Sequence, residues 1–309
     1  MNHVTSLDAL SLQNSWITIG TFDGVHRGHQ ALTHTLVEGA HQQGHPAVVI
    51  TFFPHPTVVL GKNPPPGYLT SPDERARYLG ELGVDWVVTL TFDLNMASLS
   101  AAEFMQWLTA HLGVRYLVIG YDFALGRGRE GTPERLQAIG RQLGYEVILT
   151  HPIQEGEQPI SSSHIRHLIL QGEIEAANRW LGRPYSIEGT VVRGDGRGHT
   201  LGFPTANLTI WPEKLLPANG VYATWAWVGA KRLAAVTNLG LRPTFDSPLP
   251  QRHLEAHLLD FTGDLYHQTL KLDFVARLRP EQRFASIEAL KIQIQNDIRK
   301  AREILNHVP

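Results

Sequence analysis

The first half of the chain alternates short apolar runs with amphipathic segments. The apolar runs, rich in β-branched residues, are Trp16–Gly20, Ala47–Phe52, Trp86–Leu90, Tyr116–Gly120 and Tyr145–Thr150. Runs so uniformly apolar are typical of strands that are covered on both faces, as in a parallel sheet. The alternation of strands with helices therefore predicts a doubly wound α/β fold for this half.

Helix boundaries in this half carry capping signals. Ser71-Pro72-Asp73-Glu74 supplies an N-cap, a proline at the first helical position and acids at the positive helix end. Ser100-x-x-Glu103 is a capping box. Glycines follow the expected helices, where a left-handed residue is favoured; they are Gly44, Gly83, Gly113, Gly144, Gly172 and Gly182.

The pattern changes after Arg183-Pro184, which follows two short expected helices at 161–171 and 173–181. Turns now separate the expected strands Ser186–Val192, Val221–Val228, Lys231–Leu239, Leu254–Leu259 and Leu270–Ala276. Strands without intervening helices predict a small antiparallel β-barrel. An apolar stripe from Ile287 to Leu305 predicts a closing helix. We therefore expect one domain over residues 1–183 and a second over 184–309.

Composition narrows the class of protein. A length of 309 residues fits two domains at about 150 residues each. The net charge of −2 offers no basic field for nucleic acid, and the lack of cysteine excludes disulfides and thiolate chemistry. We see neither a signal-peptide pattern nor the ~18-residue apolar stretch of a membrane span. We expect a cytoplasmic protein with small-molecule substrates, without nucleic-acid or membrane partners; an oligomer is possible but is not readable from the sequence.

The first chemical constellation lies where the first strand meets the first helix. The segment is Gly20-Thr21-Phe22-Asp23-Gly24-Val25-His26-Arg27-Gly28-His29. Glycines let the backbone approach a phosphate, the helix N-terminus attracts anions, and imidazole N–H groups donate to oxygens that gain charge. A glycine-rich turn with two surface histidines is the alternative. The position of this segment directly after a strand favours a phosphate site. We expect His26 and His29 to be catalytic there. The residues expected to bind the nucleotide and its phosphates are Gly20, Phe22, Asp23, Gly24 and Gly28.

A second phosphate clamp is expected after the fifth strand, in Ile160-Ser161-Ser162-Ser163-His164-Ile165-Arg166. Ser161, Ser162 and Ser163 offer hydroxyls at a helix start, and Arg166 offers a bidentate cation. Alone, the segment is equally typical of helix capping. Its pairing with H-x-G-H makes phosphate binding the better interpretation, with Arg166 as a catalytic candidate.

These motifs resemble a known family. H-x-G-H resembles the nucleotidyltransferase superfamily related to class I aminoacyl-tRNA synthetases, although no KMSKS-like loop follows. With Thr51-Phe52-Phe53-Pro54-His55-Pro56 and Gly120-Tyr121-Asp122-Phe123, the first half resembles the FMN adenylyltransferase part of prokaryotic bifunctional riboflavin kinase/FAD synthetases. The second half matches in order, through GDGRG (194–198), LGFPTAN (201–207), GVYA (220–223), NLGLRPTF (238–245) and EAHLLDF (255–261). The resemblance runs from about Trp16 to Arg302.

The second half also carries candidate chemistry. Gly194, Gly196 and Gly198 make a flexible loop that a phosphate can approach, although a surface hairpin is equally compatible. Thr205 and Asn207 offer hard oxygens of the kind that Mg²⁺ prefers, or belong to a strand-edge turn. Glu255, in an alternating strand, is by itself more typical of a rim carboxylate.

The resemblance assigns these residues to two ATP-dependent reactions. It implies that Thr205 and Asn207 bind Mg-ATP, with Gly202 and Pro204 in the nucleotide segment, and that Glu255 deprotonates the riboflavin 5′-hydroxyl. It places His55, Asp122, Asn238 and Arg242 near flavin. The expected function is phosphorylation of riboflavin to FMN, then adenylylation of FMN to FAD. Ala124-Leu125 replaces a usual basic–aromatic pair, so the alternatives are a kinase with weak or lost adenylylation and a non-catalytic flavin-binding protein.

Overall fold

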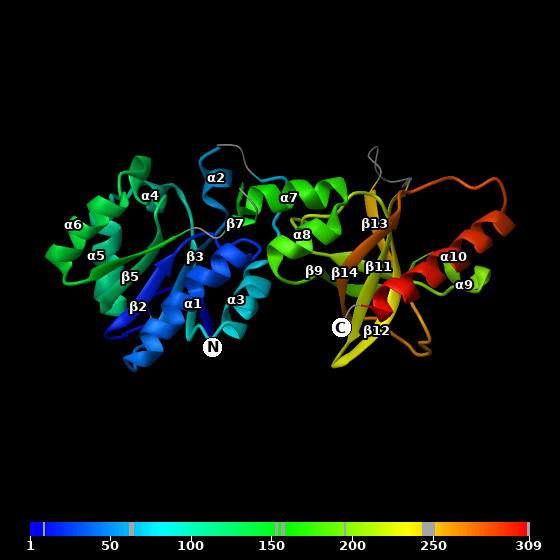
Figure 1. Cartoon of the computed structure of the whole chain (residues 1–309), viewed down its shortest axis with the longest axis horizontal. Helices are drawn as coiled ribbons and strands as arrows, with labels where there is room; N and C mark the ends of the chain where they lie inside the picture. Colours follow the sequence, from blue (N-terminus) through cyan, green and yellow to red (C-terminus); the bar gives the residue numbers. More distant parts are fainter. Residues whose placement is uncertain are drawn as a thin grey trace. The chain divides into compact units, whose positions relative to one another are not determined.

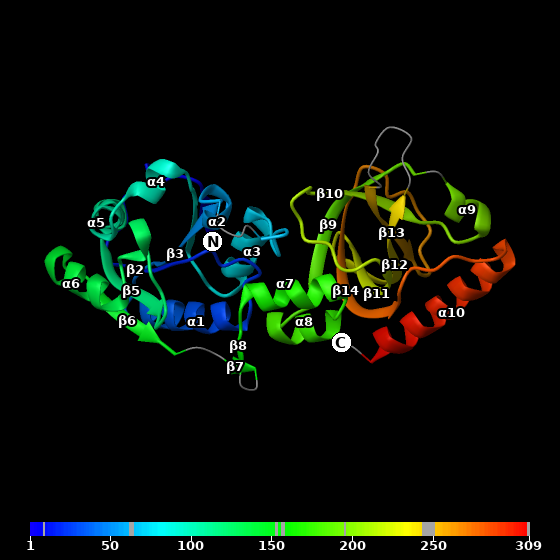
Figure 2. The same ribbon diagram turned by 90° about the horizontal axis from the view of Figure 1, so that it is seen from above.

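The computed structural model describes residues 1–8, 10–61, 65–151, 154–155, 158–194, 196–242 and 251–307. The chain divides into two compact units, Met1–Ser162 and Ser163–Pro309. Each unit contains its own sheet (Figures 1 and 2).

The first unit contains a six-stranded parallel sheet in the order β1-β4-β3-β2-β5-β6. Its strands are β1 (Asn2–Val4), β2 (Ser15–Ile19), β3 (Ala47–Phe53), β4 (Trp86–Thr91), β5 (Val114–Gly120) and β6 (Glu146–Thr150). A short hairpin follows, formed by β7 (Gln154–Glu155) and β8 (Gln158–Pro159). The five predicted strands are present.

Helices cover both faces of this sheet. Successive side chains of each strand point to opposite faces, and because most of them are apolar, both faces need to be covered. One face packs against α1 (Arg27–Gln42) and α3 (Pro72–Glu81), and the other against α5 (Ala101–Leu112) and α6 (Pro133–Leu143). The remaining elements are α2 (Pro56–Val59), α4 (Leu94–Ser98) and the 3₁₀ turn η1 (Arg127–Arg129). The doubly wound prediction is confirmed (Figure 1).

The predicted caps form as expected. Ser71 and Ser100 each make both hydrogen bonds of a capping box, with Glu74 and Glu103. The Ser100 hydroxyl and backbone N–H hold the pKa of Glu103 below its usual value. Helices α5 and α6 end at left-handed Gly113 and Gly144, so the glycine stop signals at these sites are confirmed.

The second unit contains a closed antiparallel barrel in the order β10-β13-β12-β11-β14-β9 (Figure 2). Its strands are β9 (Tyr185–Val192), β10 (Ala206–Ile210), β11 (Gly220–Val228), β12 (Lys231–Arg242), β13 (Gln251–Leu258) and β14 (Thr269–Arg279). The predicted barrel is confirmed. Strand β10 was not among the strands expected from the sequence, because it has only five residues and lies between turns.

The described residues of the second unit form the helices α7 (Ser162–Gln171, whose first residue is the last of the first unit), α8 (Ile174–Leu181), α9 (Arg197–Leu201) and α10 (Ile287–Asn306). Helix α8 packs on β14 and β9, and Asn178 of this helix donates to the carbonyl of Phe274 at 2.8 Å. The C-terminal part of the closing helix α10 packs against the barrel, and Ala301 and Leu305 of its apolar stripe are buried there. Ile287, at its start, is 57% exposed.

Candidate active sites

The loop between β2 and α1 lies at the carboxyl edge of the parallel sheet. Its backbone is left-handed at Phe22, Gly24 and Val25, with φ of 48°, 85° and 40°. Glycine adopts this conformation freely, whereas a β-branched valine does so only at a cost of about 1–3 kcal/mol. Such strain persists only where the surroundings enforce it, and it concentrates at functional sites.

The two histidines of this loop face each other at the start of α1. His26 is the N-cap, and its Nδ1 accepts the backbone N–H of His29 at 3.3 Å. The two rings stack with centroids 3.6 Å apart. Because a backbone N–H only donates, the proton of the neutral His26 ring resides on Nε2, which makes Nε2 the donor atom of this ring. A Cβ at position 28 would lie 3.2 Å from His26 Nδ1, so Gly28 permits this close arrangement.

Asp23 of the same loop points into the protein. It is fully buried and accepts the backbone N–H of Leu69 at 3.1 Å and that of Thr70 at 2.9 Å. The Thr70 hydroxyl donates to it at 3.0 Å and accepts the N–H of Gly24 at the same distance. Asp23 thus ties the loop to the chain segment that precedes α3.

A buried cation lies beside Asp23. Arg75 of α3 is 1% exposed, and its Nη2 lies 3.8 Å from Asp23 Oδ1. Its Nη1 donates to the hydroxyl of Thr51 at 3.0 Å and to the carbonyl of Phe52 at 3.2 Å. Thr51 in turn donates to the carbonyl of Thr21 at 2.9 Å. Arg75 therefore joins the end of β3, the start of α3 and the histidine loop, a role that its sequence position does not signal.

The serine segment begins beside this loop. Ser162 donates its hydroxyl hydrogen to the carbonyl of Asp23 at 2.8 Å, across 139 residues of sequence. A Cβ at Gly28 would lie 3.7 Å from the carbonyl oxygen of Ile160. Ser161 is half-buried at the same junction. Ser163 and Arg166 continue into the second unit, where Arg166 is 7% exposed.

Two predicted flavin residues follow other strands of the first sheet. His55 caps α2, and its Nδ1 accepts both the N–H of Thr57 at 3.2 Å and the Thr57 hydroxyl at 2.7 Å. Asp122 follows β5 and is exposed, while its carbonyl accepts from Arg129 at 3.4 Å. Both residues lie at the carboxyl ends of parallel strands, where ligands of this fold class bind.

A second candidate site lies on the barrel. A cavity of about 220 Å³ is lined by Gly196, Gly198, Thr205, Asn207, Asn238, Gly240, Leu241, His253, Glu255 and Glu281. Asn207 of β10 and Asn238 of β12 both pair in register with Glu255 of β13. Residues directly opposite each other in antiparallel strands share a face, so these three polar side chains form one row.

The glycine loop packs closely against this row. A Cβ at Gly194 would lie 2.3 Å from Asn207 Nδ2, and one at Gly198 would lie 3.0 Å from Thr205 Oγ1. Gly196 and Gly202 have φ of 69° and 91°, which glycine adopts without strain. The glycines therefore allow the backbone to lie against the predicted Mg-ATP residues and to turn sharply around them.

Sequence reasoning did not single out four residues that line the cavity, namely Gly240, Leu241, His253 and Glu281. His253 lies two positions before Glu255 on β13 and Gly240 two positions after Asn238 on β12, so strand alternation contained their signal. Glu281 precedes α10 and carried no such signal. Its Oε1 would lie 2.5 Å from a Cβ at position 240, which requires glycine there.

Some predicted positions carry no structural description. Asp195 of the glycine loop and Pro243-Thr244-Phe245 lie outside the described residues. Arg242 is described only in its backbone, as the last residue of β12. Within the described ranges, no three His, Asp or Glu side chains form a group able to hold a metal ion.

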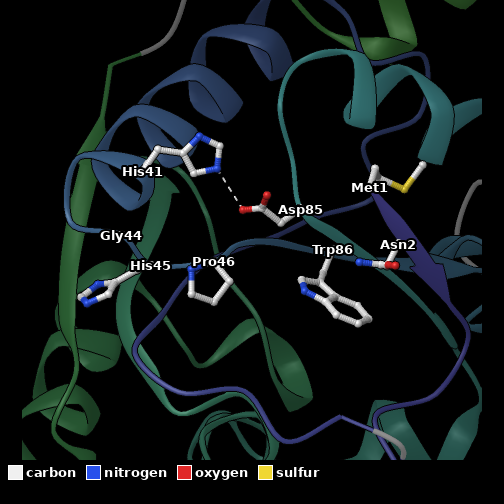
Figure 3. A pocket seen from close by; sticks show the side chains of 8 residues that line it. All are labelled: Met1, Asn2, His41, Gly44, His45, Pro46, Asp85 and Trp86. Carbon is white, nitrogen blue, oxygen red and sulfur yellow. Dashed lines mark hydrogen bonds and ion pairs between the residues drawn. The ribbon is translucent and has the colours of Figure 1, made fainter.

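A larger hollow of about 540 Å³ lies at the opposite edge of the parallel sheet, beside the starts of β1, β3 and β4 (Figure 3). His41 and Asp85 form an ion-pair contact of 2.9 Å there, and Asp85 also accepts the N–H of Ala47 at 2.8 Å. Since ligands of doubly wound sheets bind at the carboxyl ends of strands, the hollow lies away from the expected site.

The family assignment follows from comparison with known proteins. The family described as FAD synthetase matches residues 9–164, and the family described as riboflavin kinase matches residues 181–305. The chain belongs to the bifunctional riboflavin kinase/FMN adenylyltransferase family. The histidine loop lies in the part of the chain that matches FAD synthetase, and the barrel cavity lies in the part that matches riboflavin kinase.

Relatives support this assignment over nearly the full length. The bifunctional riboflavin kinase/FMN adenylyltransferase of Escherichia coli K12 is 41% identical over 93% of this chain and 91% of its own. The Bacillus subtilis enzyme of the same name is 35% identical over the same shares. Each covers both units, so both family activities are represented in one chain.

A solved structure has the same fold. It is titled a macrolide-efflux protein from Streptococcus pneumoniae, with a TM-score of 0.88 and 31% identity over 97% of this chain and 98% of that one. In the described part of the present chain, no helix has the length and apolar character needed to cross a membrane.

Proposed function

We propose that the segment 184–309 phosphorylates riboflavin to FMN and that the segment 1–183 adenylylates FMN to FAD. The observation that carries the kinase assignment is the row formed by Asn207, Glu255 and Asn238, which borders one cavity with Thr205. A carboxylate between polar side chains, beneath a glycine-rich loop, suits a hydroxyl nucleophile that meets a nucleotide phosphate.

In the kinase reaction, Glu255 accepts the proton of the riboflavin 5′-hydroxyl while that oxygen bonds to the γ-phosphorus of ATP. The bond from the γ-phosphorus to the bridging oxygen breaks, which leaves ADP and FMN. Asn238, which lines the cavity, binds flavin together with Arg242, and Gly202 and Pro204 belong to the segment that binds the nucleotide. The glycine loop at Gly194, Gly196 and Gly198 binds phosphate through its backbone.

The donor set of the cavity suits Mg²⁺ that arrives with ATP. The hydroxyl of Thr205 and the amide oxygen of Asn207 are hard ligands, and two such groups suffice because Mg²⁺ shares substrate phosphates and water. Thr205 Oγ1 and the Asn207 side chain both lie against glycine backbone, at positions where a Cβ would collide with them. When bound, the ion neutralises charge on the phosphates.

In the adenylylation reaction, a phosphate oxygen of FMN bonds to the α-phosphorus of ATP, and pyrophosphate leaves. His26 and His29 donate hydrogen bonds to the phosphate oxygens as their charge grows. The backbone at Gly20, Phe22, Gly24 and Gly28 lets the nucleotide approach. Asp23 contributes by fixing this loop, since its own carboxylate is buried.

Two further sets of residues complete this proposal. Ser161, Ser162 and Ser163 with Arg166 bind phosphate, and His55 and Asp122 bind flavin. The second phosphate clamp thus follows β6, as the histidine loop follows β2.

The decisive experiment is product analysis with ATP, Mg²⁺ and riboflavin. The unaltered chain should release FAD and pyrophosphate; FMN alone would indicate a kinase that lacks adenylylation, and unchanged bound riboflavin a binding protein. Glu255→Gln should lower FMN formation by about 10²–10⁴-fold and spare adenylylation of added FMN.

A matched control is Glu213→Gln, an exposed acid of the same unit, which should leave both rates unchanged. A fall of less than about tenfold in single-turnover FMN formation by Glu255→Gln would remove Glu255 as the base.

A further inference from the structure

His257 lies two residues beyond Glu255 on β13 and shares its face. The intervening Ala256 is fully buried in the barrel, and Leu254 and Leu258, two positions to either side of it, are buried as well. Alternation along a strand therefore places His253, Glu255 and His257 together on the outer face. The strand that carries the proposed base thus carries a second titratable side chain beside the nucleotide segment.

The imidazole of His257 holds the chain just before Thr205. Its Nδ1 lies 2.7 Å from the carbonyl oxygen of Pro204. A carbonyl only accepts, so Nδ1 must carry the hydrogen. The ring of Phe203 meets the imidazole edge-on, with the planes at 89° and the centroids 5.9 Å apart. One side chain therefore contacts both residues that precede Thr205.

The segment held by His257 in turn supports the glycine loop. The N–H of Phe203 donates to the carbonyl of Gly198 at 2.8 Å. A Cβ at Gly198 would meet the Phe203 carbonyl oxygen at 2.5 Å, so helix α9 lies directly on this segment. Displacement of Phe203 and Pro204 would move Thr205 and the glycine loop together, and misplacement by about 1 Å can cost 10²-fold in rate.

We propose that His257 is a positioning residue of the kinase reaction, because it anchors the Phe203–Thr205 segment, and through it the nucleotide loop, to the strand that carries Glu255. The inference rests on the proposed assignment of Thr205 and Asn207 to Mg-ATP. It predicts that His257 governs how well the loop binds nucleotide and has little effect on flavin binding.

The test compares His257→Phe with His257→Asn in the full chain. Phenylalanine keeps a ring against Phe203 and loses the donor, whereas the asparagine amide nitrogen occupies the place of Nδ1 and keeps it. We expect His257→Phe to raise KM for Mg-ATP by about 3- to 10-fold, the range for loss of one hydrogen bond at a solvated site. KM for riboflavin should change less than about twofold, and His257→Asn should restore KM for Mg-ATP to within about twofold.

Adenylylation of added FMN in the same chain is the internal control and should remain unchanged. Trypsin provides a second measurement, because Arg193 precedes the glycine loop and Arg197 lies within it. Cleavage after these two arginines should be faster in the phenylalanine variant than in the asparagine variant. A wild-type KM for Mg-ATP in His257→Phe, equal impairment in both variants, or an equal loss in both activities would each overturn the inference.

Thr205→Ala separates this inference from the site assignment. If Thr205→Ala leaves FMN formation intact, the assignment of Thr205 to Mg-ATP is wrong and the role of His257 falls with it. If Thr205→Ala abolishes FMN formation and His257→Phe changes nothing, only the role of His257 is wrong. Impairment by both, with rescue by asparagine, supports it.

Discussion

Asp23→Asn should destabilise the first unit far more than an ordinary change of acid to amide. The carboxylate is fully buried, and its partner Arg75 is 1% exposed at 3.8 Å. With the asparagine oxygen toward Thr70 and Arg75, the new amide nitrogen would face the N–H of Leu69, donor against donor. The substitution thus removes one partner of a buried ion pair and one hydrogen bond, which together cost about 3–5 kcal/mol.

The assay is hydrogen exchange in increasing urea, because peptides from 1–162 and from 163–309 report each unit separately. We expect the first unit to lose about 3–5 kcal/mol of its free energy of unfolding and the second to lose none. Adenylylation should fall, because the loop that carries His26 and His29 loses its anchor, while FMN formation persists.

Two comparisons make this result decisive. Asp8→Asn alters an exposed acid that bonds with Ser6, and should change stability by less than about 0.5 kcal/mol. Arg75→Met added to Asp23→Asn should cost less than the sum of the single changes, because the uncompensated cation is gone. A loss below about 1 kcal/mol in Asp23→Asn, or an equal loss in both units, would refute the buried-pair argument.

Three further expectations concern catalysis, domain limits and pH. His29→Ala removes one phosphate donor and should slow FAD formation about 10²–10³-fold while FMN accumulates; unchanged FAD output from added FMN would exclude a catalytic role. A fragment 184–309 should convert riboflavin to FMN, but its melting temperature should lie more than ~5 °C below that of a fragment 163–309. The shorter fragment lacks α8, which buries Ile174, Trp180 and Leu181 and bonds to β14. Equal melting temperatures of the two fragments would contradict this expectation. Burial raises the pKa of Tyr222 to about 12, so the contribution of its neutral hydroxyl to stability is full below pH 10 and is lost as the pH rises from about 10 to 12. Tyr222→Phe should therefore make the free energy of unfolding, measured by urea unfolding, less dependent on pH in this range. An unchanged pH dependence would refute this expectation.

The elements that the sequence predicted best have long, unambiguous patterns. The central strands of the parallel sheet are continuous apolar runs, and their caps and glycine stops agree with them. Strand β1 has only three residues, Asn2–Val4, and pairs with β4 at the sheet edge. So short a segment has no period to detect; its position depends on the backbone hydrogen bonds that β4 offers.

The residues of the candidate sites likewise divide into those that the sequence predicts and those that only the structure reveals. Thr205, Asn207, Asn238 and Glu255 were expected near the kinase substrates, and they line one cavity. Arg75 was not expected, because an arginine within an amphipathic helix is ordinarily solvated, and only the three-dimensional approach of Asp23 and Thr51 shows otherwise. Asp23 is the opposite case. Its motif suggests contact with a ligand, whereas its carboxylate accepts the backbone N–H groups of Leu69 and Thr70 and so fixes the loop.

Closure of the barrel has a consequence for biosynthesis. Strand β9, Tyr185–Val192, pairs on one side with β10 and on the other with β14, Thr269–Arg279. The ribosome therefore completes every strand of the first unit long before β9 meets its last partner. During that interval β9 presents an open edge, which is the kind of surface that favours pairing between nascent chains. Chains that stop between residues 193 and 268 should aggregate, whereas chains that stop soon after residue 162 should remain dispersed.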